Sequence, residues 1–177
     1  MNADAADSWG GINQLYLVGS HGIQGLGASA TGIGLIPPYA PLDFTKFEGT
    51  FTRLQSLPAQ FSFLLAAYGQ YALNPLFSQS PEQCGYGGRV FGRAYDPSQL
   101  LSDSCAEVLG ELRWDMPPGI KYLSQFQLYG YADHGWLHNL HGAPVLGSGG
   151  VSSTAEAASA GGGIRVGLQS PFTGDAP

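Results

Sequence analysis

Apolar and polar residues alternate with a period of two along much of this 177-residue chain, in segments of about ten residues. Such alternation places apolar side chains on one face of a β-strand and polar side chains on the other. Helical periodicity is weak, because the 27 glycines interrupt most of the chain at short intervals. We therefore expect an all-β fold, arranged as an antiparallel meander of about seven strands.

The clearest strand covers residues 106–114, with one apolar and one charged face. The apolar residues are Ala106, Val108, Leu112 and Trp114, and the charged residues are Glu107, Glu111 and Arg113. Segments 60–74, 121–133 and 160–168 repeat this design, and segments 12–20 and 42–54 do so more weakly. Each is long enough for a strand of a soluble sandwich or of a membrane barrel.

Composition favours the membrane barrel over the soluble β-sandwich. Only 11% of residues are charged, against about 25% in an average soluble domain. Aromatic residues stand near the segment ends, as interfacial girdles require; they are Tyr68, Tyr71, Trp114, Tyr122 and Tyr129. With seven basic and 13 acidic residues, the chain lacks the clustered positive charge of a nucleic-acid-binding protein.

The connections between the segments are uneven in length. Long ones cover residues 22–40, 75–103 and 138–152, whereas short turns lie at residues 57–58 and 117–119. A bacterial barrel has long loops on one side and short turns on the other. The chain has neither an apolar run of about 18 residues nor a signal peptide, which suits either a cytosolic protein or an internal piece of an exported one.

The cysteines and histidines are the residues that could carry metal, redox or catalytic chemistry. Cys84 and Cys105 can form one disulfide in an oxidising compartment or remain separate small apolar side chains, and the residues alone favour the second interpretation. The closely spaced His138 and His141 stand in a glycine-flanked segment that would not fix ligand geometry. We expect no metal, no cofactor, no catalytic residue and no enzymatic activity.

The long connection contains GGRVFGRAYD, residues 87–96. Together with its flanks, it resembles the outer-membrane transporters of two-partner secretion, the hemolysin secretion/activation proteins. The elements that carry the resemblance occur in the family's order and are Gly87-Gly88, Phe91-Gly92-Arg93-Ala94-Tyr95, Ser102-Asp103 and Glu111-Leu112-Arg113. The resemblance covers roughly residues 8–170, and it rests on the ordered set rather than on any single motif.

The resemblance implies that residues 1–177 are a partial transmembrane barrel in the outer membrane of a Gram-negative bacterium. The motif would lie in a long loop at about residues 75–103, and the periplasmic domains and closing strands of a barrel of about sixteen strands would be absent. The implied function is export of a hemolysin- or adhesin-type exoprotein through a monomeric barrel bounded by outer-membrane lipid. The alternative is a soluble or surface-exposed β-sandwich-like binding domain.

The resemblance also implies that the motif loop folds into the lumen and that Arg93 pairs with an aspartate, here Asp133. Parity supports this independently, because Asp133 shares the polar face of its segment with Gln127. Glu111, on the polar face of the preceding segment, is the alternative partner for Arg93. The remaining residues expected to shape the loop are Gly87, Gly88, Gly92 and Tyr95. The three glycines would allow positive φ or close backbone approach. The alternative is that they are ordinary loop glycines.

Overall fold

The computed structural model describes residues 2–23, 43–76, 82–116, 119, 123–140, 143–149 and 152–168. Its regular structure within these ranges consists of β-strands. They are β1 (Asn2–Ala6), β2 (Gly11–His21), β3 (Thr45–Ser56), β4 (Phe61–Ala72), β5 (Cys84–Tyr86), β6 (Leu100–Ser102), β7 (Ser104–Met116), β8 (Leu123–His138) and β9 (Thr154–Leu168). No helix in the described part of the chain is both long enough and apolar enough to cross a bilayer.

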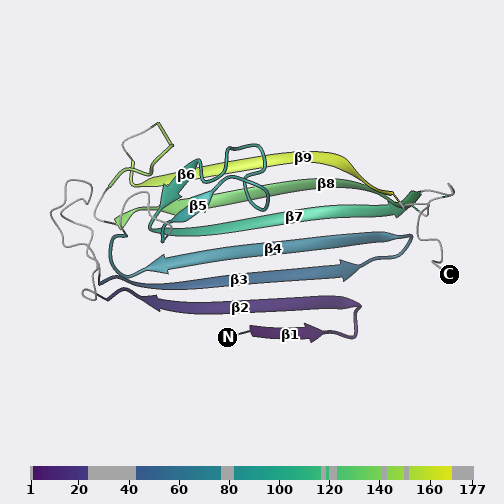
Figure 1. Cartoon of the computed structure of the whole chain (residues 1–177), viewed down its shortest axis with the longest axis horizontal. Coiled ribbons are helices and arrows are strands. Elements are labelled where there is room, and N and C mark those ends of the chain that lie inside the picture. The colour runs from purple at the N-terminus through teal and green to yellow at the C-terminus, as the bar shows by residue number, and fades with distance from the viewer. Residues whose placement is uncertain are drawn as a thin grey trace, which may run out of the picture.

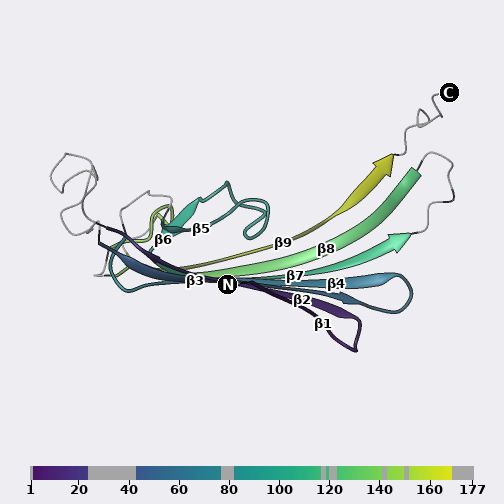
Figure 2. The ribbon, with the colours of Figure 1, turned by 60° about the horizontal axis from the view of Figure 1, so that its bottom comes forward.

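Seven strands form one antiparallel sheet in the order β1-β2-β3-β4-β7-β8-β9, and β5 pairs with β6 separately (Figure 1). Successive strands of the large sheet are neighbours, so its topology is a meander with β5 and β6 inserted between β4 and β7. Figure 2 shows that the sheet is curved and that β5, β6 and the segment between them lie over its concave side. The predicted all-β antiparallel meander of seven strands is therefore confirmed.

Strand boundaries differ from the prediction mainly at the C-terminal end. β8 continues to His138, so His134 and His138 lie in a strand and not in a glycine-flanked loop. β9 begins at Thr154, because the alanine-rich stretch before Ala160 pairs with the extended end of β8. Alanine and glycine have low β-propensity, and cross-strand pairing overrides it here.

One further difference is an additional strand at the N-terminal end of the chain. The short strand β1 was not predicted, because its sequence NADAA offers only small apolar residues to an alternation pattern; it pairs with β2 along its whole length. Residues 121 and 122, at the start of the predicted segment 121–133, lie outside the described residues, and with them Tyr122 of the expected girdle.

The cross-strand register assigns the two faces of the sheet. Phe63, Leu112 and Gly130 pair in succession on the convex face, and Leu64, Glu111 and Tyr131 pair in succession on the concave face. The convex face exposes large apolar side chains, namely Phe47, Phe61, Phe63, Tyr71, Leu112, Trp136, Ile164 and Val166. The concave face buries polar ones, namely Lys46, Gln70, Glu107, Glu111, Gln127 and Asp133. This inverts the pattern of a water-soluble protein and fits lipid on the convex side.

An arginine on the convex face is expected to impair membrane assembly. Leu112→Arg would place a guanidinium in lipid at a cost of about 2–4 kcal/mol near the midplane. Thr50→Arg, on the partly wet concave face of β3, is the matched control and should assemble normally. The measurement is the fraction of the full-length protein recovered folded in the membrane; equal recovery of the two variants would contradict the face assignment.

The hydrophobic core lies between the concave face and the segment that covers it. It consists of Cys84, Tyr86, Leu100, Cys105, Leu137, Val145 and Ala157. Two strands of the inserted hairpin and three strands of the wall contribute to it, together with the connection after β8. Burial of these side chains fixes the inserted segment against the sheet, where the candidate site is formed.

Candidate functional site

The motif loop, defined here as residues 84–102, begins and ends in the β5–β6 hairpin and is covalently joined to the wall. Cys84 of β5 forms a disulfide with Cys105 of β7, with their Cα atoms 6.2 Å apart. This corrects the interpretation of two separate cysteines. Sequence spacing alone did not reveal the pair, because Cys84 reaches β7 only when the loop folds back over the sheet.

Glu111 of β7 is the centre of the charged cluster beneath the loop. Its side chain is fully buried and contacts three arginines, of which Arg93 comes from the loop. Arg113 donates from Nε at 2.6 Å, and Arg165 of β9 donates from Nη2 at 3.2 Å. The Nη1 atom of Arg165 lies 2.9 Å from the same carboxylate and donates to Gln127. Charge-assisted bonds of this kind are the strong class of hydrogen bonds. The cluster therefore joins loop, β7 and β9 through one carboxylate.

Two tyrosines of β8 line the same cluster and contact its arginines through their rings. The Arg93 guanidinium lies 4.5 Å from the centre of the Tyr131 ring, and that of Arg165 lies 3.9 Å from the Tyr129 ring. Stacking of this kind stabilises a partly desolvated guanidinium in addition to its ion pair. No role was predicted for Tyr131. Tyr129 and Tyr68 were expected in an interfacial girdle, and this is wrong, because both lie on the concave face, where Tyr129 stacks on Arg165 and Tyr68 donates to Glu48.

Asp133 does not pair with Arg93, so the predicted Arg93–Asp133 bridge is wrong in this structure. The Asp133 carboxylate instead accepts hydrogen bonds from the Tyr86 hydroxyl at 2.5 Å and from the Ser159 hydroxyl at 2.8 Å. Glu111, named as the alternative, is the partner of Arg93. Both carboxylates share the concave face, as their parity indicated, but parity does not tell which of them lies beneath Arg93.

Tyr86 reaches Asp133 because the wall has no side chain in its path. A Cβ at Gly135 of β8 would clash with the Tyr86 ring, whose Cε2 would lie only 2.7 Å away. The buried ring also packs edge-on against Tyr95 with centroids 5.5 Å apart. Burial, and then the hydrogen bond to Asp133, raise the pKa of Tyr86 above its ordinary value, so the hydroxyl stays protonated and donating.

The motif glycines adopt backbone conformations that disfavour other residues. Gly87 and Gly88 have φ of 120°, and Gly92 has φ of 67°. A Cβ on Gly92 would lie 2.8 Å from the backbone nitrogen of Gly87, so the turn needs glycine for space as well as for φ. The expectation of positive φ at these three positions is confirmed. Tyr95, in the same turn, donates its hydroxyl to the carbonyl of Ala158 at 3.4 Å.

Asp103 is buried, and its contacts were not predicted from the sequence. Its carboxylate accepts the backbone N–H groups of Leu76 and Leu140 at 2.9 Å each. Its own N–H donates to the side chain of Asn139 at 2.8 Å. Asp103 thus connects the segments that follow β4 and β8 at the end of the sheet with the long connections.

The described residues bring one group of potential metal ligands together. Cys84, Cys105 and Glu107 place their ligand atoms within 4.8 Å of one another. The two sulfurs are joined in the disulfide, so neither is the thiolate that binds a metal. Of the histidines considered above, His138 lies in β8, and His141 lies outside the described residues.

An antiparallel sheet with an apolar exposed face, and a charged concave face covered by an inward-folded loop, is typical of the class of outer-membrane β-barrels. The sequence matches the model of the haemolysin secretion/activation protein ShlB/FhaC/HecB family over residues 8–165. The chain belongs to this family, whose members are outer-membrane transporters of Gram-negative bacteria. The resemblance noted from the motif set is thereby confirmed.

A solved structure shows the same fold. CdiB from Escherichia coli superposes with a TM-score of 0.74 at 20% sequence identity, over 94% of this chain and 29% of that chain. The chain therefore spans less than a third of the length of this structural relative. Among curated proteins, no sequence matches the chain.

Proposed function

We propose that this chain is part of a two-partner secretion pore that exports an exoprotein of hemolysin or adhesin type across the outer membrane. Family membership supports this proposal. The observation that carries it is the motif loop held on the concave face by Glu111 and by the Cys84–Cys105 disulfide. A loop attached inside a pore narrows and shapes the path of an unfolded chain.

The proposal extends to the parts of the barrel beyond this chain. The seven-stranded sheet would be one sector of a monomeric barrel of about sixteen strands, closed by further strands so that no edge meets lipid. Its convex face would contact outer-membrane lipid and its concave face would contact the exoprotein. We expect transport to need no catalytic residue and no cofactor.

Export of the exoprotein tests the proposal directly. Cells that lack the transporter should retain the exoprotein, and the full-length wild-type transporter should restore it to the medium. A transporter recovered without detergent, together with unchanged export in the deletion strain, would favour the soluble binding domain instead. Exoprotein in the medium is normalised to transporter present in the outer membrane.

The role of the loop in export is tested by Arg93→Ala. Loss of a charge-assisted hydrogen bond of about 1.5–3 kcal/mol would lower the ratio of wall-bound to open loop by roughly tenfold or more. Export should therefore fall several-fold. Glu111→Gln should add less to Arg93→Ala than it costs alone, because the two substitutions remove the same Arg93–Glu111 contact.

Arg89→Ala is the matched control for the loss of Arg93. Arg89 is an exposed arginine of the same loop, and the Arg93 guanidinium contacts only its backbone carbonyl. Export by this variant should equal that of the wild type. Full additivity of Arg93→Ala and Glu111→Gln, or equal defects in Arg89→Ala and Arg93→Ala, would contradict the proposed role of the ion pair.

A further inference from the structure

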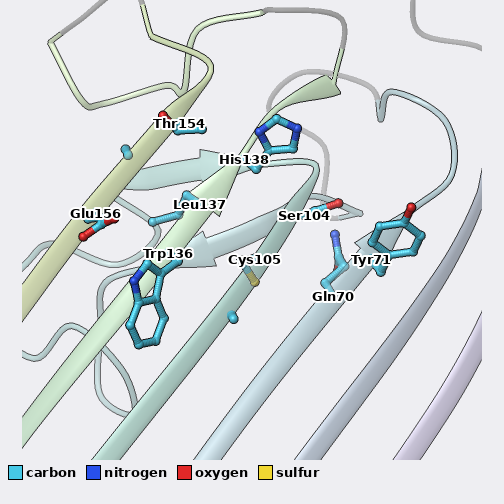
Figure 3. Close-up of a pocket in the computed structure, with 11 residues that line it drawn as sticks. Gln70, Tyr71, Ser104, Cys105, Trp136, Leu137, His138, Thr154 and Glu156 are labelled. Carbon is cyan, nitrogen blue, oxygen red and sulfur yellow. The ribbon is translucent and has the colours of Figure 1, made fainter.

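The convex face contains a groove near the end of the sheet that carries the long connections. It has a volume of about 380 Å³, and Figure 3 shows two of its aromatic residues, Tyr71 of β4 and Trp136 of β8, on either side of β7. The register explains the hollow, because Trp136 pairs with Ala106, and Ala106 pairs with Gly69. Ala106 thus forms the floor of the groove between two large exposed rings.

The groove lies at the level of one aromatic girdle of the lipid-facing band. Trp114 pairs with Leu128 toward the opposite end of the sheet, and Trp136 lies eight residues further along β8. Eight residues span about 27 Å of strand. A strand tilt of about 40° reduces this to about 20 Å of depth, close to the apolar band of an outer-membrane barrel. Trp136 therefore lies where acyl chains meet polar headgroups.

Most polar groups of the groove lie toward the end with the long connections, whereas Glu156 is level with Trp136, its cross-strand partner. Ser104, His138 and Thr154 pair with one another across β7, β8 and β9, two residues beyond the Ala106–Trp136 pair. Glu156 also lines the groove, and its carboxylate lies 3.6 Å from Nε2 of His134. The result is an amphipathic site with an apolar trough toward the membrane interior and hydrogen-bonding groups at its rim.

We propose that this groove binds one acyl chain of an outer-membrane lipid, with the lipid's polar linkage at the rim formed by His138 and Thr154. The occupant is a lipid because the groove is continuous with the face that the family's location places against the bilayer. Its volume of about 380 Å³ corresponds to roughly a dozen water molecules, at about 30 Å³ each. Aromatic walls and a small-residue floor hold such a chain in place, in contrast to the mobile lipid around a flat apolar surface.

Retention of lipid by the full-length transporter tests this site. The wild type, extracted in a mild detergent and examined by native mass spectrometry, should retain one lipid per protein. Ala106→Phe fills the floor with a ring and should lower this occupancy at least fivefold. Ala132→Phe is the matched control, since it adds the same ring at another exposed alanine of the convex face; its occupancy should equal that of the wild type.

A second measurement uses the wild-type chain and does not depend on the folding of Ala106→Phe. The fluorescence of Trp136, taken as the difference between wild type and Trp136→Phe, is followed in phosphatidylcholine vesicles with increasing mole fractions of a lipid brominated in its acyl chain. If one brominated lipid occupies the groove, quenching of Trp136 should reach its maximum at a low mole fraction of brominated lipid. Random contact with the surrounding lipid would require a much higher mole fraction for the same quenching. Quenching proportional to mole fraction, or equal lipid retention by both phenylalanine variants, would mean ordinary contact with surrounding lipid and would overturn the proposal. Neither result depends on export, so the proposed function is tested separately.

Discussion

Glu111→Ala is expected to lower the stability of the transporter by about 3–5 kcal/mol, the usual cost of removing one partner from a buried ion pair. Arg93, Arg113 and Arg165 would remain close together, without the fully buried carboxylate that they share. Their mutual repulsion adds to the loss of the hydrogen bonds. The measurement is the guanidinium chloride midpoint of the full-length transporter in detergent micelles, followed by loss of near-ultraviolet circular dichroism.

Two comparisons identify the origin of this effect. Glu156→Ala removes a carboxylate that is 68% exposed, and it should change the stability by no more than about 0.5 kcal/mol. Arg93→Ala should cost less than Glu111→Ala, because Arg113 and Arg165 keep their partner. Equal costs for Glu111→Ala and Glu156→Ala would show that the cluster is solvated and that its bonds contribute little.

The sequence predicted the architecture better than it predicted the contacts across it. Period-two alternation assigned Glu107, Glu111 and Asp133 to the concave face, because side-chain direction in a strand depends only on parity. The partner of Arg93 depends on how the motif loop, residues 84–102, folds back, which neither parity nor propensity specifies. The same reason explains the Cys84–Cys105 disulfide, since its two halves meet only through the path of that loop.

The glycines indicate less in the sequence than they explain in the structure. In the sequence, the many glycines argued mainly against helices. In the structure, Gly135 is the place where the Tyr86 ring meets the wall, and Gly92 forms a left-handed turn that brings the loop back on itself. A glycine in a strand signals close approach of another group, but it does not name that group. For this reason Tyr86 was missed as the partner of Asp133.

Removal of the disulfide is expected to loosen the base of the motif loop. In the chain-entropy model, a cross-link over a separation of 21 residues contributes about 3 kcal/mol. The variant Cys84→Ser/Cys105→Ser avoids an unpaired thiol and should populate open states of the loop about a hundredfold more. Hydrogen–deuterium exchange of peptides from residues 84–102 in the full-length transporter measures this change.

The comparison of this variant with Arg93→Ala distinguishes two ways of holding the loop. The disulfide joins the start of the loop to β7, whereas Arg93 joins its turn to Glu111 further along the same strand. If the attachments act separately, the double-serine variant should speed exchange near Cys84, and Arg93→Ala should speed it near Gly92. Reduction of the wild type should reproduce the first pattern. If exchange is unchanged by both reduction and the serine pair, then the buried contacts of Tyr86 and the Glu111 cluster alone determine where the loop lies.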